Sequence, residues 1–114
     1  MNISWDILAR QLHSEAENKG FWEPIDRMDN QDDFIFYAKQ IAMIHSEATE
    51  VLEALRKDKG EQAVVEEIAD IIIRTFDLWA GLEKRGVVKS SLDQTMIHKM
   101  NINQERPRLH GVRG

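Results

Sequence analysis

Four acidic residues have the types and the spacing of a metal site. Glu47 and Glu50 form one pair, Glu67 and Asp70 form a second pair, and the members of each pair are three positions apart. Residues three apart on a helix project from the same side, so each pair presents its two carboxylates together. Carboxylate oxygens are ligands that Mg²⁺ and Mn²⁺ prefer, and the chain has no cysteine to favour a softer metal. The sequence therefore predicts a site for a divalent cation.

Two long helices are predicted to carry these pairs. No glycine or proline interrupts residues 32–59 or residues 61–80. Apolar residues recur at steps of three and four through both stretches, which is the pattern of an amphipathic helix. Residues 56–60 predict a turn between the two helices, with Gly60 as the C-terminal cap of the first.

This hairpin is expected to bring the two acidic pairs together. Antiparallel helices place residues that are equidistant from their turn side by side, and both Glu50 with Glu67 and Glu47 with Asp70 meet that condition. Two like charges about 4 Å apart repel by roughly 4 kcal/mol at an effective dielectric constant of 20. Convergence therefore favours a bound cation or a retained proton. The Glu-x-x-His motifs of di-iron helical bundles are absent from these positions.

Further helices are predicted on either side of the hairpin. Apolar residues within 5–12 mark a first helix, with Ser4 as its N-cap. Ser90 and Ser91 each head a sequence that resembles a capping box, and the helix that they open is expected to run to about Asn103. No segment alternates between apolar and polar residues as a strand does. We therefore predict an all-α fold, a four-helix bundle.

Length and composition limit the class of protein. With 114 residues the chain has room for one domain, residues 1–114. It has no apolar run near the roughly 18 residues that span a bilayer, and no secretory signal pattern at its start. We therefore expect a cytoplasmic protein with no membrane partner.

Charge is divided unevenly along the chain. Residues 47–83 have a net charge of −6, whereas residues 84–114 have a net charge of +5. An acidic centre repels nucleic acid unless metal intervenes, so nucleic acid is not an expected partner. An acidic centre followed by a basic end suits a metal bound together with an anionic ligand.

The acidic pairs and their surroundings resemble a known family. The chain resembles the MazG-like all-α nucleoside triphosphate pyrophosphohydrolases, relatives of the dimeric dUTPases and the dCTP pyrophosphatases. The hallmark of that family is an ExxE motif followed by an ExxD motif, here residues 47–50 and 67–70. Residues 19–23 resemble an N-terminal element of small members, and residues 99–111 resemble their closing signature. The likeness extends over most of the chain.

The resemblance implies an enzyme. The expected reaction is hydrolysis of a nucleoside triphosphate between its α- and β-phosphates, which yields a monophosphate and pyrophosphate and removes unwanted nucleotides from the pool. The expected cofactor is Mg²⁺, with Mn²⁺ as a substitute. One carboxylate of the first motif, Glu47 or Glu50, would orient or deprotonate the attacking water, and Glu47 is our first choice. The expected metal ligands are Glu47, Glu50, Glu67 and Asp70.

The basic end of the chain is expected to bind the substrate. Arg106 can form bidentate bonds to phosphate. Ile102 departs from the family, which has an aromatic residue there, and this bears on the choice of base. Phe21 and Trp22 follow Gly20, and an aromatic residue there would stack on the base or close the end of the bundle. The residues that we predict to bind substrate are Lys99, Asn103, Arg106, His110 and Trp22.

Two charged residues extend the line of Asp70 along its helix. Arg74 follows Asp70 by one turn, so we expect it to pair with that carboxylate and keep it ionised. Asp77 follows by a second turn and is expected to have a structural role.

Two kinds of protein fit these features. The first is the enzyme, which we expect to form a homodimer or homotetramer through its helices, because family members line one pocket with residues from both subunits. The second is a non-catalytic helical interaction module, such as a regulatory dimer, that retains the fold. The second kind predicts that metal has no effect on stability.

Overall fold

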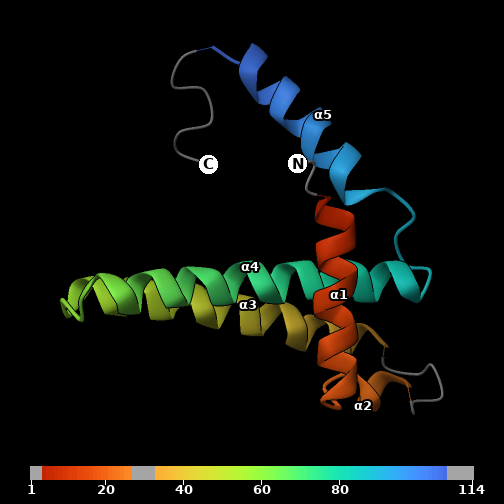
Figure 1. The fold of residues 1–114 in the computed structure, drawn as a ribbon, viewed down its shortest axis with the longest axis horizontal. Helices are drawn as coiled ribbons and strands as arrows, with labels where there is room; N and C mark the ends of the chain where they lie inside the picture. The colour runs from red at the N-terminus through yellow and green to blue at the C-terminus, as the bar shows by residue number, and fades with distance from the viewer. Residues whose placement is uncertain (1–3, 27–32, 108–114) are drawn as a thin grey trace.

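Helices form the regular structure of this protein. The computed structural model describes residues 4–26 and 33–107, and no strand occurs in those two ranges. The all-α prediction is therefore confirmed for the described residues, with a short second helix that the sequence pattern did not predict. No helix in this part of the chain is both long and apolar enough to cross a membrane. The helices are α1 (Trp5–Asn18), α2 (Glu23–Asp26), α3 (Asp33–Arg56), α4 (Glu61–Lys84) and α5 (Leu92–Glu105) (Figure 1).

α3 and α4 form an antiparallel hairpin of two helices with 24 residues each (Figure 1). The amide of Lys59 donates to the carbonyl of Ala54 at 2.9 Å and so closes the end of α3. Asp58 and Gly60 turn the chain with φ angles of 51° and 100°, in the region that favours short polar residues and glycine. Gly60 is the N-cap of α4 and not the predicted C-cap, because Asp58 takes the left-handed position after α3.

The core lies where α1 and α2 meet one end of the hairpin (Figure 1). Its buried cluster consists of Trp22, Ile25 and Phe36, and the side chain of Trp22 is only 1% exposed. A Cβ atom on Gly81 of α4 would overlap the six-membered ring of Trp22. Glycine at that position therefore lets the indole lie directly against the backbone of α4.

α5 is attached to the rest of the molecule through its first turn. Asp93 accepts hydrogen bonds from Ser4 Oγ at 2.7 Å and from the Trp5 amide at 2.6 Å. Asp6 in turn accepts from Ser91 Oγ and from the Asp93 amide, both at 2.7 Å. Each helix thus supplies an aspartate that caps the N-terminus of the other, where the helix dipole favours negative charge.

The remainder of α5 points away from the hairpin (Figure 1), and none of its residues is buried. Its first turn begins as predicted, because Ser91 Oγ accepts from the amide of Gln94 at 3.2 Å. Within one copy of the described chain, however, α5 does not lie alongside the hairpin. The single copy is therefore a hairpin crossed by α1 and not the predicted four-helix bundle.

Acid is expected to release the first turn of α5. The hydrogen bond from Ser4 and those from two backbone amides hold the pKa of Asp93 below its ordinary value of 3.8. A lowered pKa means that this contribution to stability is complete above about pH 3.8 and is lost as the pH falls through the folded value. Amide NMR signals at the start of α5 should shift in that acidic range. The variant Asp93→Asn cannot titrate, so a transition that persists in it would contradict this assignment.

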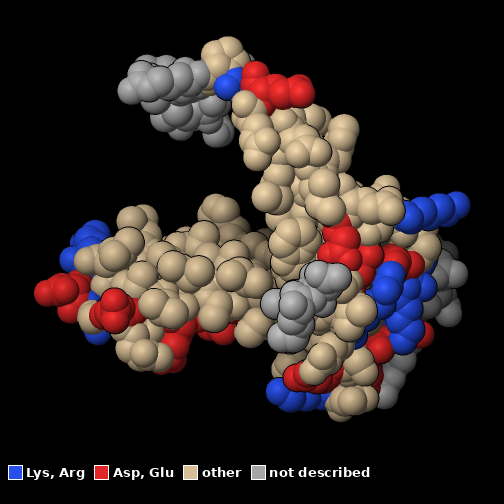
Figure 2. Space-filling view, turned by 45° about the horizontal axis from the view of Figure 1, so that its top comes forward, with Lys and Arg blue, Asp and Glu red and all other residues tan. Residues whose placement is uncertain are grey.

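A broad uncharged surface extends along the hairpin and over α5 (Figure 2). Much of it is apolar, and large hydrophobic side chains are exposed on all three helices. Monomeric proteins seldom expose contiguous apolar patches of more than a few hundred Å², and larger ones mark binding surfaces. Examples that are each more than two fifths exposed are Ile41, Leu52, Leu55, Val65, Ile68, Ile72, Ile97 and Met100.

Candidate metal centre

The hairpin brings three of the four predicted metal ligands together. Glu47 of α3 and Glu67 and Asp70 of α4 each offer a carboxylate oxygen, and these oxygens all lie within 4.8 Å of one another. Glu47 and Asp70 are equally many residues from the turn, and they lie close together as that spacing predicts. Glu50 is exposed and supplies no oxygen to this group. We call Glu47, Glu67 and Asp70 the carboxylate cluster.

Glu67 has a raised pKa within the carboxylate cluster. Desolvation raises the pKa of Glu67, and a hydrogen bond with Glu47 and the charges of the other carboxylates raise it further. A raised pKa means that the folded state retains the proton to higher pH than the unfolded state does. Ionisation of Glu67 therefore lowers stability as the pH rises through the folded value. A divalent cation at the cluster would offset the repulsion between its carboxylates.

Arg74 supplies positive charge to the cluster from α4. Its Nε donates to Glu47 Oε1 at 3.1 Å, across the hairpin. The prediction that Arg74 pairs with Asp70, one turn away on the same helix, is wrong. The guanidinium instead reaches the carboxylate that the antiparallel register places opposite it.

A cavity of about 330 Å³ opens beside the cluster, between α1 and α4. Glu47, Asp70 and Arg74 line one part of it, and Lys19 and Phe21 line another. A volume of this order is at the lower end of the range for pockets that hold small molecules. The cavity thus joins two members of the carboxylate cluster, two basic side chains and an aromatic ring in one space.

Trp22 is in the core and does not line this cavity. Its Nε1 donates to Asp77 Oδ1 at 3.0 Å, and its ring packs between His13 at 4.6 Å and Phe36 at 5.1 Å, measured between centroids. The prediction that Trp22 binds substrate is therefore corrected, because the ring has no free face for a base. Its neighbour Phe21 is 62% exposed and lies on the cavity wall.

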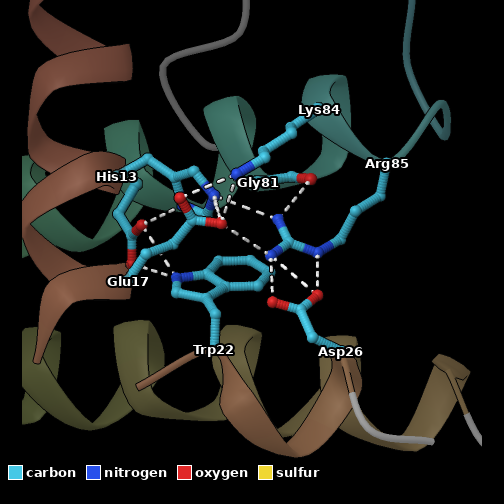
Figure 3. A network of polar contacts seen from close by, with 8 residues as sticks. His13, Glu17, Trp22, Asp26, Gly81, Lys84 and Arg85 are labelled. Carbon is cyan, nitrogen blue, oxygen red and sulfur yellow. Dashed lines mark hydrogen bonds and ion pairs between the residues drawn. The ribbon is translucent and has the colours of Figure 1, made fainter. Parts of the chain in front are cut away.

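A polar network holds Trp22 in this position (Figure 3). Arg85 Nη1 lies 3.0 Å from His13 Nε2, and a guanidinium can only donate, so Nε2 accepts. His13 Nδ1–H then donates to Asp77 Oδ1 at 2.7 Å. Burial raises the pKa of Asp77, and the hydrogen bonds from His13 and Trp22 oppose that shift. Asp77 therefore has the structural role that we predicted, and it also borders the cavity.

Helix α5 does not bring its predicted substrate-binding residues to the cavity. Lys99 and Asn103 are exposed on α5, and Arg106 is exposed at its C-cap. None of the three lines the cavity or belongs to the carboxylate cluster. His110 lies outside the described residues. The sequence pattern placed Lys99 and Asn103 on one helix but could not indicate the direction of that helix.

Sequence reasoning did not assign a role to Lys19 or identify His13. Lys19 is adjacent to Gly20, whose φ of 85° marks a tight turn, and that turn positions Lys19 and Phe21 on the cavity wall. His13 is 3% exposed, and its position on the inner face of α1 was the available signal.

The arrangement suits a hard divalent cation and an anionic ligand. The cation would take oxygens of the carboxylate cluster, and Mg²⁺ commonly keeps further positions for water and phosphate oxygens. Two members of the cluster, Glu47 and Asp70, line the cavity, which leaves such positions accessible. No protein-family model, no curated protein and no solved structure matches this chain, so the functional argument depends on the site itself.

Proposed function

We propose that this protein is a Mg²⁺-dependent hydrolase that cleaves nucleoside triphosphates between the α- and β-phosphates. The products would be a nucleoside monophosphate and pyrophosphate. The observation that carries the proposal is the meeting of Glu47, Glu67 and Asp70 from two antiparallel helices, with Glu47 and Asp70 on the wall of a cavity. The resemblance of the two acidic motifs to those of the MazG-like family supports the same activity.

Each residue of the site would have a distinct role in the reaction. Glu47, Glu67 and Asp70 would hold the cation, which when bound supplies positive charge to the phosphate chain. Glu50 lies one turn from Glu47 on α3 and outside the cluster, so we now favour Glu50 over Glu47 for orienting the water and accepting its proton. Glu50 would also reach the cation through a bound water molecule.

Lys19 and Phe21 would contact the nucleotide at the other side of the cavity. Phe21 offers an exposed ring for the base, and it replaces Trp22 in that role. The ammonium of Lys19 would neutralise part of the phosphate charge. Removal of unwanted nucleotides in the cytoplasm is the biological setting that we propose for this reaction.

A second copy of the chain would complete the site. Lys99, Asn103 and Arg106 lie away from the cavity of their own copy, on a helix that exposes Ile97 and Met100. We propose that the exposed apolar surface of the hairpin and α5 joins copies into a homodimer or homotetramer. In that assembly α5 of one copy would approach the cavity of another.

The same exposed surface favours the second candidate, a non-catalytic helical interaction module. Such a module would use the apolar surface of the hairpin and α5 to bind its partner, and its carboxylate cluster would have no catalytic role. The two candidates differ in what they predict for metal and for nucleotide turnover.

A product assay separates the two candidates. The protein is incubated with ribo- and deoxynucleoside triphosphates in Mg²⁺, Mn²⁺ or EDTA, and monophosphate with pyrophosphate is resolved from diphosphate with phosphate. The enzyme predicts monophosphate and pyrophosphate in metal, none in EDTA, and a strong loss in Glu50→Gln. An absence of turnover for every nucleotide, with a melting temperature that metal leaves unchanged, would favour the interaction module.

A further inference from the structure

Arg74 differs from the other ion-paired arginines in how it uses its guanidinium. Arg10, Arg56 and Arg85 each place Nε and a terminal nitrogen on a single carboxylate, at 2.7 to 3.1 Å. Arg74 donates to Glu47 through Nε alone, at 3.1 Å. Within residues 4–26 and 33–107, its two terminal nitrogens make no hydrogen bond. They remain able to bind another anion.

Those terminal nitrogens belong to a side chain on the cavity wall. Arg74 lines the cavity of about 330 Å³ together with Asp70 and Glu47, and its side chain is 38% exposed. A guanidinium presents its donors in a plane that matches two oxygens of a phosphate group. The free edge of Arg74 is therefore suited to an oxyanion inside the cavity.

Glu47 is shared between two positive partners. It contributes an oxygen to the carboxylate cluster, and it also accepts the hydrogen bond from Arg74. A divalent cation at the cluster would repel the adjacent guanidinium and would compete with it for the Glu47 carboxylate. We therefore expect the contact between Arg74 and Glu47 to weaken when a cation binds at the cluster.

We propose that Arg74 is an exchangeable counter-ion, which holds Glu47 until a divalent cation binds and then turns its guanidinium to the phosphate chain in the cavity. This inference rests on the proposed function. The exchange keeps the Glu47 charge balanced before metal binds. It also makes a second cation available for phosphate once the first has taken the carboxylate.

The proposal predicts opposite effects on two ligands in one variant. Arg74→Gln removes the competing charge, so Mn²⁺ alone should bind about fivefold more tightly than to the wild type, by isothermal titration calorimetry. The same variant loses a charge-assisted contact, so the Mn²⁺ complex of inorganic triphosphate should bind about tenfold more weakly. A purely structural ion pair would predict weaker binding of both ligands.

Arg56→Gln is the matched control. Arg56 also pairs with a glutamate, Glu53, but at the end of α3 near the turn. Its loss removes one positive charge and one ion pair without touching the cavity. The affinities for Mn²⁺ and for the triphosphate complex should both remain within twofold of the wild type, as expected for a distant exposed charge under salt screening.

The wild-type protein provides an independent readout if Arg74→Gln fails to fold. The Nε–H proton of Arg74 should exchange with water faster when Mg²⁺ saturates the protein, and more slowly again when inorganic triphosphate is added, as followed by ¹⁵N NMR. An unchanged rate of proton exchange, or weaker Mn²⁺ binding by a folded Arg74→Gln, would overturn the proposal that Arg74 is an exchangeable counter-ion.

The failure of this inference can be told apart from the failure of the proposed function. A wild type that binds no Mn²⁺ would overturn both. Tight Mn²⁺ binding with the predicted pair of effects, but without nucleotide hydrolysis, would support the exchange and overturn the hydrolase. Hydrolysis together with unchanged Mn²⁺ affinity in Arg74→Gln would support the hydrolase and overturn the counter-ion exchange.

Discussion

Asp70→Asn is expected to lower nucleotide turnover by about 10³-fold while leaving the fold intact. The substitution removes one of three convergent charges, and so it weakens the hold on a cation that we expect to supply several kcal/mol of transition-state stabilisation. Without metal, the variant should be at least as stable as the wild type, because it lacks part of the repulsion that raises the pKa of Glu67. Steady-state kinetics in saturating Mg²⁺ and urea unfolding in EDTA measure the two effects.

Glu66→Gln is the control for this prediction. Glu66 precedes Glu67 on α4, is exposed, and accepts a hydrogen bond from Gln62 at 2.9 Å. The substitution removes the same charge one turn away on the same helix but from outside the cluster. Turnover should stay within about twofold of the wild type. Equal losses of turnover in Glu66→Gln and Asp70→Asn would show that turnover depends on the net charge of α4 and not on the carboxylate cluster.

Trp22→Ala is expected to lower the free energy of unfolding by about 3–5 kcal/mol. The indole is 1% exposed and fills the space against Gly81, so truncation would leave a large void. It would also remove the Nε1–H donor from Asp77, which burial already makes costly to ionise. Urea unfolding followed by circular dichroism measures the loss.

Phe21→Ala is the control at the adjacent position. Phe21 is 62% exposed, so its truncation should change the unfolding free energy by less than about 0.5 kcal/mol. It should instead raise KM for the nucleotide, because the exposed ring lies on the cavity wall. A large stability loss in Phe21→Ala with a small one in Trp22→Ala would contradict the positions of both rings.

Local pattern was sufficient to predict the four longer helices and part of the site. The apolar spacing of three and four residues marks α3 and α4, and the hydroxyls of Ser4 and Ser91 cap α1 and α5 as expected. The antiparallel register followed from the position of the turn. It placed Glu47 opposite Asp70, and those two residues do meet.

Contacts between distant segments account for what the sequence did not predict. The sequence pattern does not distinguish Phe21 from Trp22 as the buried residue. In the structure, it is Trp22 that packs into the open space over Gly81. Arg74 could reach a carboxylate on its own helix or on the neighbouring one, and only the packing of α3 against α4 selects Glu47. The direction of α5 depends on the reciprocal caps formed with Asp6 and Asp93.

The most direct test of the metal centre is a titration of Mn²⁺ monitored by electron paramagnetic resonance, in the wild type and in Glu67→Gln. Glu67 belongs to the carboxylate cluster, and desolvation together with the neighbouring carboxylates raises its pKa. We predict saturable Mn²⁺ binding that Mg²⁺ displaces in the wild type, and binding at least about tenfold weaker in Glu67→Gln. Equal Mn²⁺ binding by the two proteins, or none by either, would contradict a metal centre at this cluster.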